Sequence, residues 1–512
     1  MIHGTRPLLV LMLLAGCTAG PAQERAGGGI APRRDGTSAA ATIRPVDFLA
    51  RIGFLADDAL RGRDTPSAGL EVAAAYIASE FRSFGLEPAG DSGSFLQRYP
   101  YTVRTLRTAD ATLEVAGTTG SPPLRHASDY YLSPGGPAPA LGPIVFVGRA
   151  ASLPQLPPGS LDGRIALADL AAADFRAVTQ ARTAVAAAGA TGLLLALDGA
   201  VTAEEIARNA AGARGGRAMA PIPVAYLRRD RVMELATAAG AELSNLLADA
   251  ATAGFRPREL TGASARIAAP VSEVTHRPPN VAGLLRGSDP VLRETYIVIS
   301  AHMDHLGVGR PDASGDSIYN GADDDASGTS AVLELAEAFA SLPVPPARSL
   351  IFVTVSGEEK GLLGSGYFAA NLPVPAGSVI ANINIDMIGR NAPDTVVAIG
   401  QEYSSLGPLV QQVRSRHPEL GLVVAPDPWP EQRFFFRSDH FNFAKQEIPA
   451  IFFFTGTHED YHRPSDEVER IDLDKITRVT RLIYHLAEEL ASSPEAPAWT
   501  DEDLAEVRRL TR

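Results

Sequence analysis

Short apolar runs that recur along the second half of the chain constrain its fold more than any other feature. They lie at 295–300, 350–355, 379–385, 395–399 and 450–454. Segments with the three- and four-residue apolar spacing of helices lie between and after them, at 327–340, 405–416 and 472–491. Strands that are apolar throughout are typical of a parallel sheet that helices cover on both faces. We therefore predict an α/β fold with a mostly parallel mixed sheet flanked by helices.

Side chains that can bind a metal ion follow these strands or precede a helix. They are His302, the acidic run Asp323–Asp325, the pair Glu358–Glu359, Asp386 and His462. In an open α/β sheet, ligands bind beyond the carboxyl ends of the strands. We therefore expect these side chains to meet in one functional site.

The donor types in this set point to a divalent ion. Imidazole nitrogen and carboxylate oxygen are the ligands of zinc or a similar metal. Two sites that share one Asp would give each ion about three protein donors plus water, which leaves the open position that catalysis requires. Each residue alone has a plainer explanation, such as a structural His, an acidic helix cap or a solvated turn. Together they would have to fall by chance at the strand ends of one sheet.

The spacing within the motifs suggests a division of roles. Asp304 follows His302 by two residues and is placed to hold a nearby group from outside the ligand set. If the chain is extended at Glu358 and Glu359, one carboxylate would bind metal while the other faces the substrate water. Metal-assisted hydrolysis needs a Lewis acid and a free base. The spacing does not decide which member of the acidic run is the ligand.

Five motifs occur in a characteristic order: SAHMDHLG, YNGADDDASGTSAVLELA, SGEEKGLLGS, NIDMIG and DYHRPSD. In this order they resemble peptidase family M28, a family of co-catalytic zinc exopeptidases whose typical members are aminopeptidases. The resemblance covers about 280–490, with weaker similarity at 45–130. It implies two zinc ions, peptide or protein substrates, and a cis peptide bond between Asp324 and Asp325.

The resemblance also implies roles for individual residues. The positions that match the metal ligands of the family are His302, Asp324, Glu359, Asp386 and His462. Asp324 matches the carboxylate that bridges the two ions, and Glu358 matches the general base. Asp304 matches the acid that supports the first ligand. Tyr461 matches a residue that in some members helps to stabilise the oxyanion.

The remaining histidines near the motifs are His305, His440 and His458. We interpret them as supporting or rim residues, because the set of five ligands is complete without them. Asp439 is placed to hold a loop over the site.

We expect an aminopeptidase in which Glu358 takes a proton from an activated water. A carboxypeptidase or dipeptidase on the same scaffold would need a basic residue for the C-terminal carboxylate, and Arg390, Arg433 and Arg437 are candidates. A glutaminyl cyclase, which in relatives uses a single zinc, is a third alternative. A binding protein with an inert catalytic domain would have lost ligand residues, and none is lost here.

Residues 131–255 differ in composition from the rest of the chain. They are rich in Ala and Gly and contain no metal-type cluster, and short apolar strands lie at 144–147, 165–167, 193–197 and 223–226. The order GPIVFVG, LDGRIALADL, AVAAAGATGLLLA, PIPVAYL resembles a protease-associated (PA) domain, a small β-rich module. We predict that this PA-like domain is inserted into a catalytic domain made of 43–130 and 256–495, with a tail at 496–512. A substrate-gating role and no catalytic role both remain open for it.

Residues 1–17 have the features of an export signal. Arg6 precedes the apolar run Leu8–Leu14, and the following residues up to Cys17 resemble a bacterial lipobox, whose Cys receives a lipid. Cys17 is the only cysteine of the chain, so no intramolecular disulfide can form. We expect export to the periplasm or cell surface, attachment to the membrane only through a lipid at Cys17, and a disordered tether at 18–42.

The charge of the chain argues against one class of partner. The 512 residues carry a formal net charge of -13, and 45% of them are hydrophobic. Nucleic-acid binding needs a basic footprint, which this chain lacks, so we expect no nucleic-acid partner. A chain of this length favours two domains plus a targeting segment.

Overall fold

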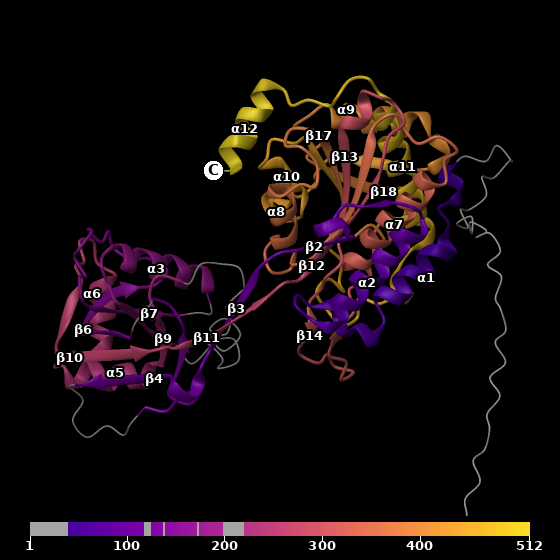
Figure 1. Ribbon diagram of the computed structural model, residues 1–512. Coiled ribbons are helices and arrows are strands. Elements are labelled where there is room, and N and C mark those ends of the chain that lie inside the picture. The colour runs from indigo at the N-terminus through magenta and orange to yellow at the C-terminus, as the bar shows by residue number, and fades with distance from the viewer. Residues whose placement is uncertain (1–38, 117–123, 137–138, 172–173, 198–219, 512) are drawn as a thin grey trace, which may run out of the picture.

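Two separate β-sheets organise the protein. The computed structural model describes residues 39–511, except 117–123, 137–138, 172–173 and 198–219. Figure 1 shows two lobes joined by an antiparallel ribbon, which consists of β3 (Tyr101–Leu106) and β11 (Val271–His276). The predicted export signal, with Cys17, and most of the predicted tether lie outside the described residues and stay predictions. The end of that tether differs from expectation, because Ala39–Thr42 form a short helix with Ala40 buried in the core.

The larger lobe is built on a sheet of nine strands among the described residues, in the order β1-β12-β16-β13-β17-β20-β18-β19, with β2 also paired to β12. The strands are β1 (Glu87–Pro88), β2 (Leu96–Arg98), β12 (Pro279–Leu285), β13 (Tyr296–His302), β16 (Ser349–Val355), β17 (Val379–Ile385), β18 (Thr395–Ile399), β19 (Val423–Ala425) and β20 (Ala450–Phe454). The central strands β16, β13, β17 and β20 are parallel, whereas β12 and β18 run antiparallel to their neighbours in this group. The predicted mostly parallel mixed sheet is confirmed.

Helices cover both faces of this sheet, which explains why its strands are apolar throughout. One face packs against α1 (Pro45–Leu55), α2 (Ala68–Ser83), α7 (Gly328–Ala340), α9 (Leu406–Arg416) and α11 (Leu473–Ser492). The other face packs against α8 (Leu363–Ala370) and α10 (His440–Ala444) (Figure 1). Within β13, Ile297 and Ile299 face the first group and Val298 faces the second. The alternation of the strand therefore places successive apolar side chains in the cores on its two faces.

The smaller lobe contains seven strands among the described residues, in the order β4-β10-β6-β7-β8-β9-β5. They are β4 (Thr112–Ala116), β5 (Tyr130–Ser133), β6 (Ala140–Arg149), β7 (Ile165–Leu170), β8 (Gly192–Leu197), β9 (Val224–Arg228) and β10 (Arg258–Ala268). Its helices are α3 (Phe175–Ala187), α5 (Arg229–Ala238) and α6 (Leu243–Ala250). The lobe extends beyond the predicted 131–255, because β10 pairs with both β4 and β6.

The segment predicted as a C-terminal tail is folded. It contains α12 (Asp501–Thr511), and Val507 of this helix is buried. The Trp499 Nε1–H donates to the backbone oxygen of Glu447 at 2.8 Å, and Arg508 forms an ion pair with the Glu447 side chain at 2.7 Å. Across the described ranges, no helix has the length and apolar character needed to cross a membrane.

Candidate metal centre

The carboxyl ends of the central strands bring the predicted site residues to one edge of the larger sheet. His302 is the last residue of β13, and Asp386 directly follows β17. The turn after β16 carries Glu358–Glu359, and the loop after β20 carries His462. Asp324 lies in a helical turn immediately before α7. Five separate segments of the chain therefore contribute to one site.

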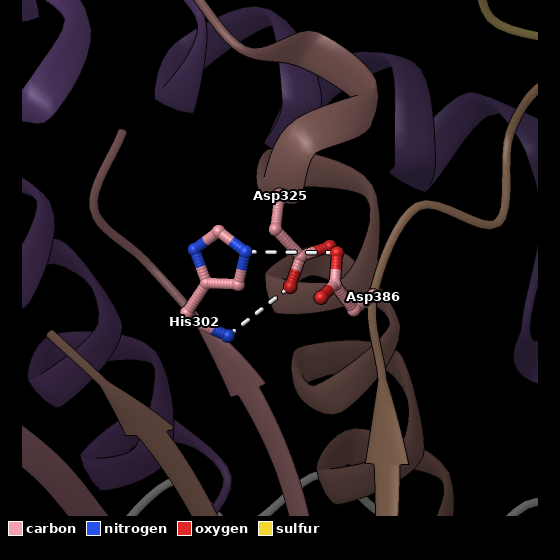
Figure 2. A group of neighbouring side chains, drawn as sticks. All are labelled: His302, Asp325 and Asp386. Atoms are coloured by element: carbon pink, nitrogen blue, oxygen red, sulfur yellow. Dashed lines mark hydrogen bonds and ion pairs between the residues drawn. The ribbon is translucent and has the colours of Figure 1, made fainter. Parts of the chain in front are cut away.

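Asp324 lies between two groups of potential metal-ligand atoms, called here the first and second donor groups. The first contains His302 and Asp386, and the second contains His462 and Glu359. Asp324 Oδ1 is 3.2 Å from His302 Nε2, and the same nitrogen is 3.6 Å from Asp386 Oδ1. Its Oδ2 is 3.2 Å from His462 Nε2, which is 3.5 Å from Glu359 Oε1. Donors that lie about 2.0–2.1 Å from one tetrahedral ion are roughly 3.4 Å apart, so both groups have the spacing of a metal site. Figure 2 shows His302 and Asp386 facing each other in the first group.

The three consecutive acids before α7 have different contacts. Asp325 accepts backbone N–H hydrogen bonds from His302 at 3.1 Å, Gly328 at 2.8 Å and Met387 at 3.2 Å. Asp325 lies beside His302 and Asp386 (Figure 2), but these donors already satisfy its two oxygens. Asp323 accepts from the Gly389 N–H at 2.7 Å. Among the described residues no backbone N–H reaches the Asp324 carboxylate, so its oxygens are free to face the two histidines.

The cis peptide bond that the family resemblance implied between Asp324 and Asp325 is present. Asp325 also accepts from the N–H of Gly328, the first residue of α7, whose N-cap residue is Ser327. One carboxylate of the acidic run thus satisfies the start of the helix, and another, Asp324, faces the two histidines.

The Glu358–Glu359 pair lies in a turn and not in extended chain. The backbone oxygen of Glu358 accepts from the Gly361 N–H at 2.8 Å, which closes the turn. The argument from strand alternation therefore had a wrong premise, although the two side chains do separate. Glu359 faces the second donor group, whereas Glu358 lines the cleft above it. Burial raises the pKa of Glu358 well above its ordinary value.

His305 is closer to the candidate ligands than its sequence position indicated. The imidazole is fully buried, and its Nδ1 lies 2.8 Å from Glu359 Oε1 and 3.7 Å from Asp324 Oδ2. With these two carboxylates it forms a further group of potential ligand atoms. The motif SAHMDH contains His305, but the spacing within the motif does not show whether its imidazole contacts the candidate ligands or lies at the rim of the site.

Asp304 supports the turn of Glu358 more directly than it supports His302. Its buried carboxylate accepts from Thr65 Oγ1 at 2.8 Å and from the Glu358 N–H at 3.3 Å. His302 Nδ1 lies 3.0 Å from the backbone oxygen of Asp304 but 3.8 Å from its carboxylate. The backbone oxygen therefore orients the imidazole, and the carboxylate holds the turn. Burial raises the pKa of Asp304 to about 6.

The other predicted supporting residues are buried around the site and belong to neither donor group. His458 Nε2 lies 3.3 Å from Asp323 Oδ2. The His440 ring stacks on Phe452 at 4.9 Å, and burial lowers the pKa of His440 to about 3. Burial raises the pKa of Asp439 to about 7.

A cleft of about 350 Å³ opens onto the donor groups. Its lining includes the apolar side chains of Met387, Phe434, Phe452 and Phe454. Tyr461 also lines the cleft, and its ring stacks on that of His462 with centroids 3.8 Å apart. Burial raises the pKa of Tyr461, so its hydroxyl remains a hydrogen-bond donor at neutral pH.

Ser438 fixes the orientation of Asp386. Its Oγ donates to Asp386 Oδ2 at 2.7 Å and accepts from Asn384 Nδ2 at 2.9 Å. The hydrogen bond occupies one oxygen of Asp386 and leaves Oδ1 facing His302. Outer partners of this kind orient the side chains that hold a metal.

Replacement of Ser438 by Ala is expected to lower metal affinity about 10- to 100-fold, the usual effect of removing such a partner. A chelator competition titration measures this affinity. Ser349→Ala is the matched control, because the Ser349 hydroxyl is also buried but donates to the backbone oxygen of Arg293 at 2.7 Å, at the opposite end of the sheet. Equal affinities for the two variants would contradict the role of Ser438.

Known proteins resemble this chain in sequence and in fold. Residues 280–487 match the model of Peptidase family M28. A probable zinc metalloprotease of Pyricularia oryzae is 28% identical over 293 residues, which are 48% of this chain and 56% of that protein. The chain therefore spans little more than half of that relative's length.

Solved structures share the fold. An aminopeptidase from Aneurinibacillus sp. strain AM-1 has a TM-score of 0.57 at 21% identity, over 90% of this chain and 96% of that one. A zinc aminopeptidase from Bacillus subtilis has a TM-score of 0.50 at 18% identity, over 89% of this chain and 97% of that one. The sequence match over residues 280–487 is therefore to Peptidase family M28, and the chain shares the fold of these solved aminopeptidases.

Proposed function

We propose that this protein is a zinc-dependent aminopeptidase that holds two zinc ions through the shared carboxylate of Asp324. The observation that carries the proposal is the position of Asp324, whose Oδ1 faces His302 and whose Oδ2 faces His462. The match of residues 280–487 to Peptidase family M28 supports it, as do similar proteins named as a zinc metalloprotease and an aminopeptidase.

The residues of the site fit two divalent ions. Buried Glu359 Oε1 lies 2.8 Å from His305 Nδ1 and 3.5 Å from His462 Nε2, but neither ring is aligned for a hydrogen bond to it. A buried carboxylate oxygen without a donor is costly, and a cation removes that cost. One ion would be held by His302, Asp324 and Asp386, and the other by Asp324, Glu359 and His462. When bound, such ions lower the pKa of water and polarise the scissile carbonyl.

Glu358 takes the proton of the attacking water and passes it to the leaving amine. It lines the cleft beside both donor groups and belongs to neither. Burial raises its pKa, and a general base with a raised pKa holds the abstracted proton more tightly before it is passed on. Asp304 holds the backbone of Glu358 from within the core, so the position of the base is set by a buried anchor.

The Tyr461 hydroxyl donates a hydrogen bond to the oxyanion that forms on the scissile carbonyl. A donor that is already in place when the charge develops stabilises the transition state without reorganisation. The stacking of Tyr461 on His462 holds the ring beside the second donor group. Restriction to the chain end follows if the free α-amine of the substrate is captured by a carboxylate or an ion of the site.

Metal analysis of the purified protein, combined with a panel of peptides, tests this function. We expect two zinc ions per chain, release of nitroaniline from aminoacyl-p-nitroanilides, and no cleavage of peptides with a blocked amine. Cleavage of amino-blocked peptides with a free carboxylate would instead show a carboxypeptidase. One zinc per chain with cyclisation of N-terminal Gln would show a glutaminyl cyclase, and metal-free protein without turnover would leave a binding function.

A further inference from the structure

Arg437 is a cation in the cleft, and its surroundings differ from those of the other arginines near the site. It lines the same cleft as Asp324, Glu358 and Asp386, and its side chain is exposed. Within the part of the chain that the structure describes, no carboxylate lies within ion-pair distance of its guanidinium. An arginine placed among the reacting groups is therefore left with its charge available to a ligand.

Stacking on an aromatic ring positions this guanidinium. Its Cζ lies 4.7 Å from the ring centroid of Phe434, which is buried and packs against Phe454 at 4.9 Å. A cation–π contact holds the cation over the face of the ring and uses none of its N–H groups to bind a carboxylate. The N–H donors lie in the plane of the group and point outward from its edge. Two of them can bind one carboxylate side by side, a geometry that lysine does not offer.

The other two arginines that the sequence suggested for carboxylate binding have different surroundings. Arg390 forms an ion pair with Asp460 at 2.6 Å. Arg433 lies over the Phe436 ring at 4.5 Å and is not part of the cleft lining. Tertiary structure therefore selects Arg437 from three candidates that the sequence did not separate.

We propose that Arg437 binds a carboxylate of the substrate and makes the site prefer substrates that carry one close to the scissile bond. The inference rests on the proposed peptidase function. The cleft lining also contains the acidic residues Asp324, Glu358 and Asp386, whose like charge disfavours an anionic substrate, and Arg437 offsets this repulsion. The carboxylate belongs to the side chain of an N-terminal Asp or Glu, or to the C-terminus of a dipeptide, since both present the same chemical group.

Two pairs of substrates distinguish these sources. Glu-p-nitroanilide against Gln-p-nitroanilide isolates a side-chain carboxylate, and Leu-Gly against Leu-Gly-amide isolates a C-terminal one. The measured quantity is the ratio of kcat/KM, acid over neutral, within each pair. In Arg437→Gln we expect this ratio to fall about 10- to 100-fold for at least one pair, the size of effect typical of a lost hydrogen bond to a charged group. Arg437→Lys, which keeps the charge but not the paired donors, should lose less.

Arg433→Gln is the matched control, because it removes an arginine that also stacks on a phenylalanine but lies outside the cleft lining. Its ratios should equal those of the wild type. In the wild type the preferred ratio should also decrease with added salt, which screens an exposed charge pair. Ratios in Arg437→Gln that match the wild type for both pairs would overturn the inference. Failure of the wild type to cleave any of the four substrates would instead count against the peptidase function itself.

Discussion

Replacement of Glu358 by Gln is expected to lower kcat for N-terminal hydrolysis by about 10²- to 10⁴-fold, the contribution typical of a general base. Gln has the same shape but cannot accept the proton of the attacking water. Both metal ions should stay bound, because Glu358 lines the cleft and belongs to neither donor group. Steady-state kinetics on leucine p-nitroanilide and metal analysis of the same preparation measure the two effects.

The neighbouring residue provides the contrast for this experiment. Glu359→Gln changes the same kind of side chain one position away, but Glu359 Oε1 lies 3.5 Å from His462 Nε2 in the second donor group. That variant should lose metal from the second group, and its activity should fall for that reason. Turnover near the wild-type rate in Glu358→Gln, or loss of metal from it, would refute the assignment of Glu358 as the base.

Replacement of Asp324 by Ala is expected to weaken metal binding at both donor groups, by more than about 100-fold. Loss of a direct ligand should exceed the 10- to 100-fold effect of losing an outer partner. Both groups are affected because each contains one oxygen of Asp324. Zinc stoichiometry after dialysis against a graded chelator series is the measurement, with circular dichroism to confirm that the variant is folded.

Asp386→Ala serves as the comparison for Asp324→Ala. Asp386 Oδ1 lies 3.6 Å from His302 Nε2, and Asp386 has no ion-pair contact with His462 or Glu359 among the described residues. The Asp386→Ala variant should therefore bind one zinc ion more weakly and retain the other. Equal stoichiometries in the two variants would argue against a carboxylate shared between the sites.

The main features of the larger lobe could be predicted from the sequence because they depend on local patterns. The apolar runs at 295–300, 350–355 and 379–385 correspond to β13, β16 and β17, each within one or two residues of its observed bounds. Burial on both faces leaves no alternation in these strands, and that signature is visible in a single sequence. The limits of the smaller lobe were less visible, since β4 and β10 pair although they are far apart in the chain.

The candidate site could be predicted in composition but not in detail. Six acidic and imidazole side chains at strand ends were enough to indicate a divalent ion. The structure distinguishes Asp324 from Asp325 because the backbone N–H groups of His302 and Met387, which come from two other segments, occupy the Asp325 oxygens. No spacing within the acidic run contains that information.

Two contacts of the site could likewise not be predicted from the sequence. The orientation of the turn at Glu358 depends on the buried carboxylate of Asp304, which accepts from the Glu358 N–H. His305 was visible as a residue beside a motif, but its contact with Glu359 joins the ends of two different strands. Both contacts form between segments that approach each other only when the sheet has assembled.

The sequence by itself determined the α/β class of the larger lobe, the position of the site at the strand ends and the types of atom available there, because periodicity and residue chemistry are local properties. Tertiary structure alone decided which carboxylate faces both histidines, which side chains hold Glu358, and which arginine of the cleft has no acidic partner among the described residues. These distinctions depend on how donors and acceptors from separate strands pair in a buried space, where each oxygen or nitrogen must find a partner or a ligand.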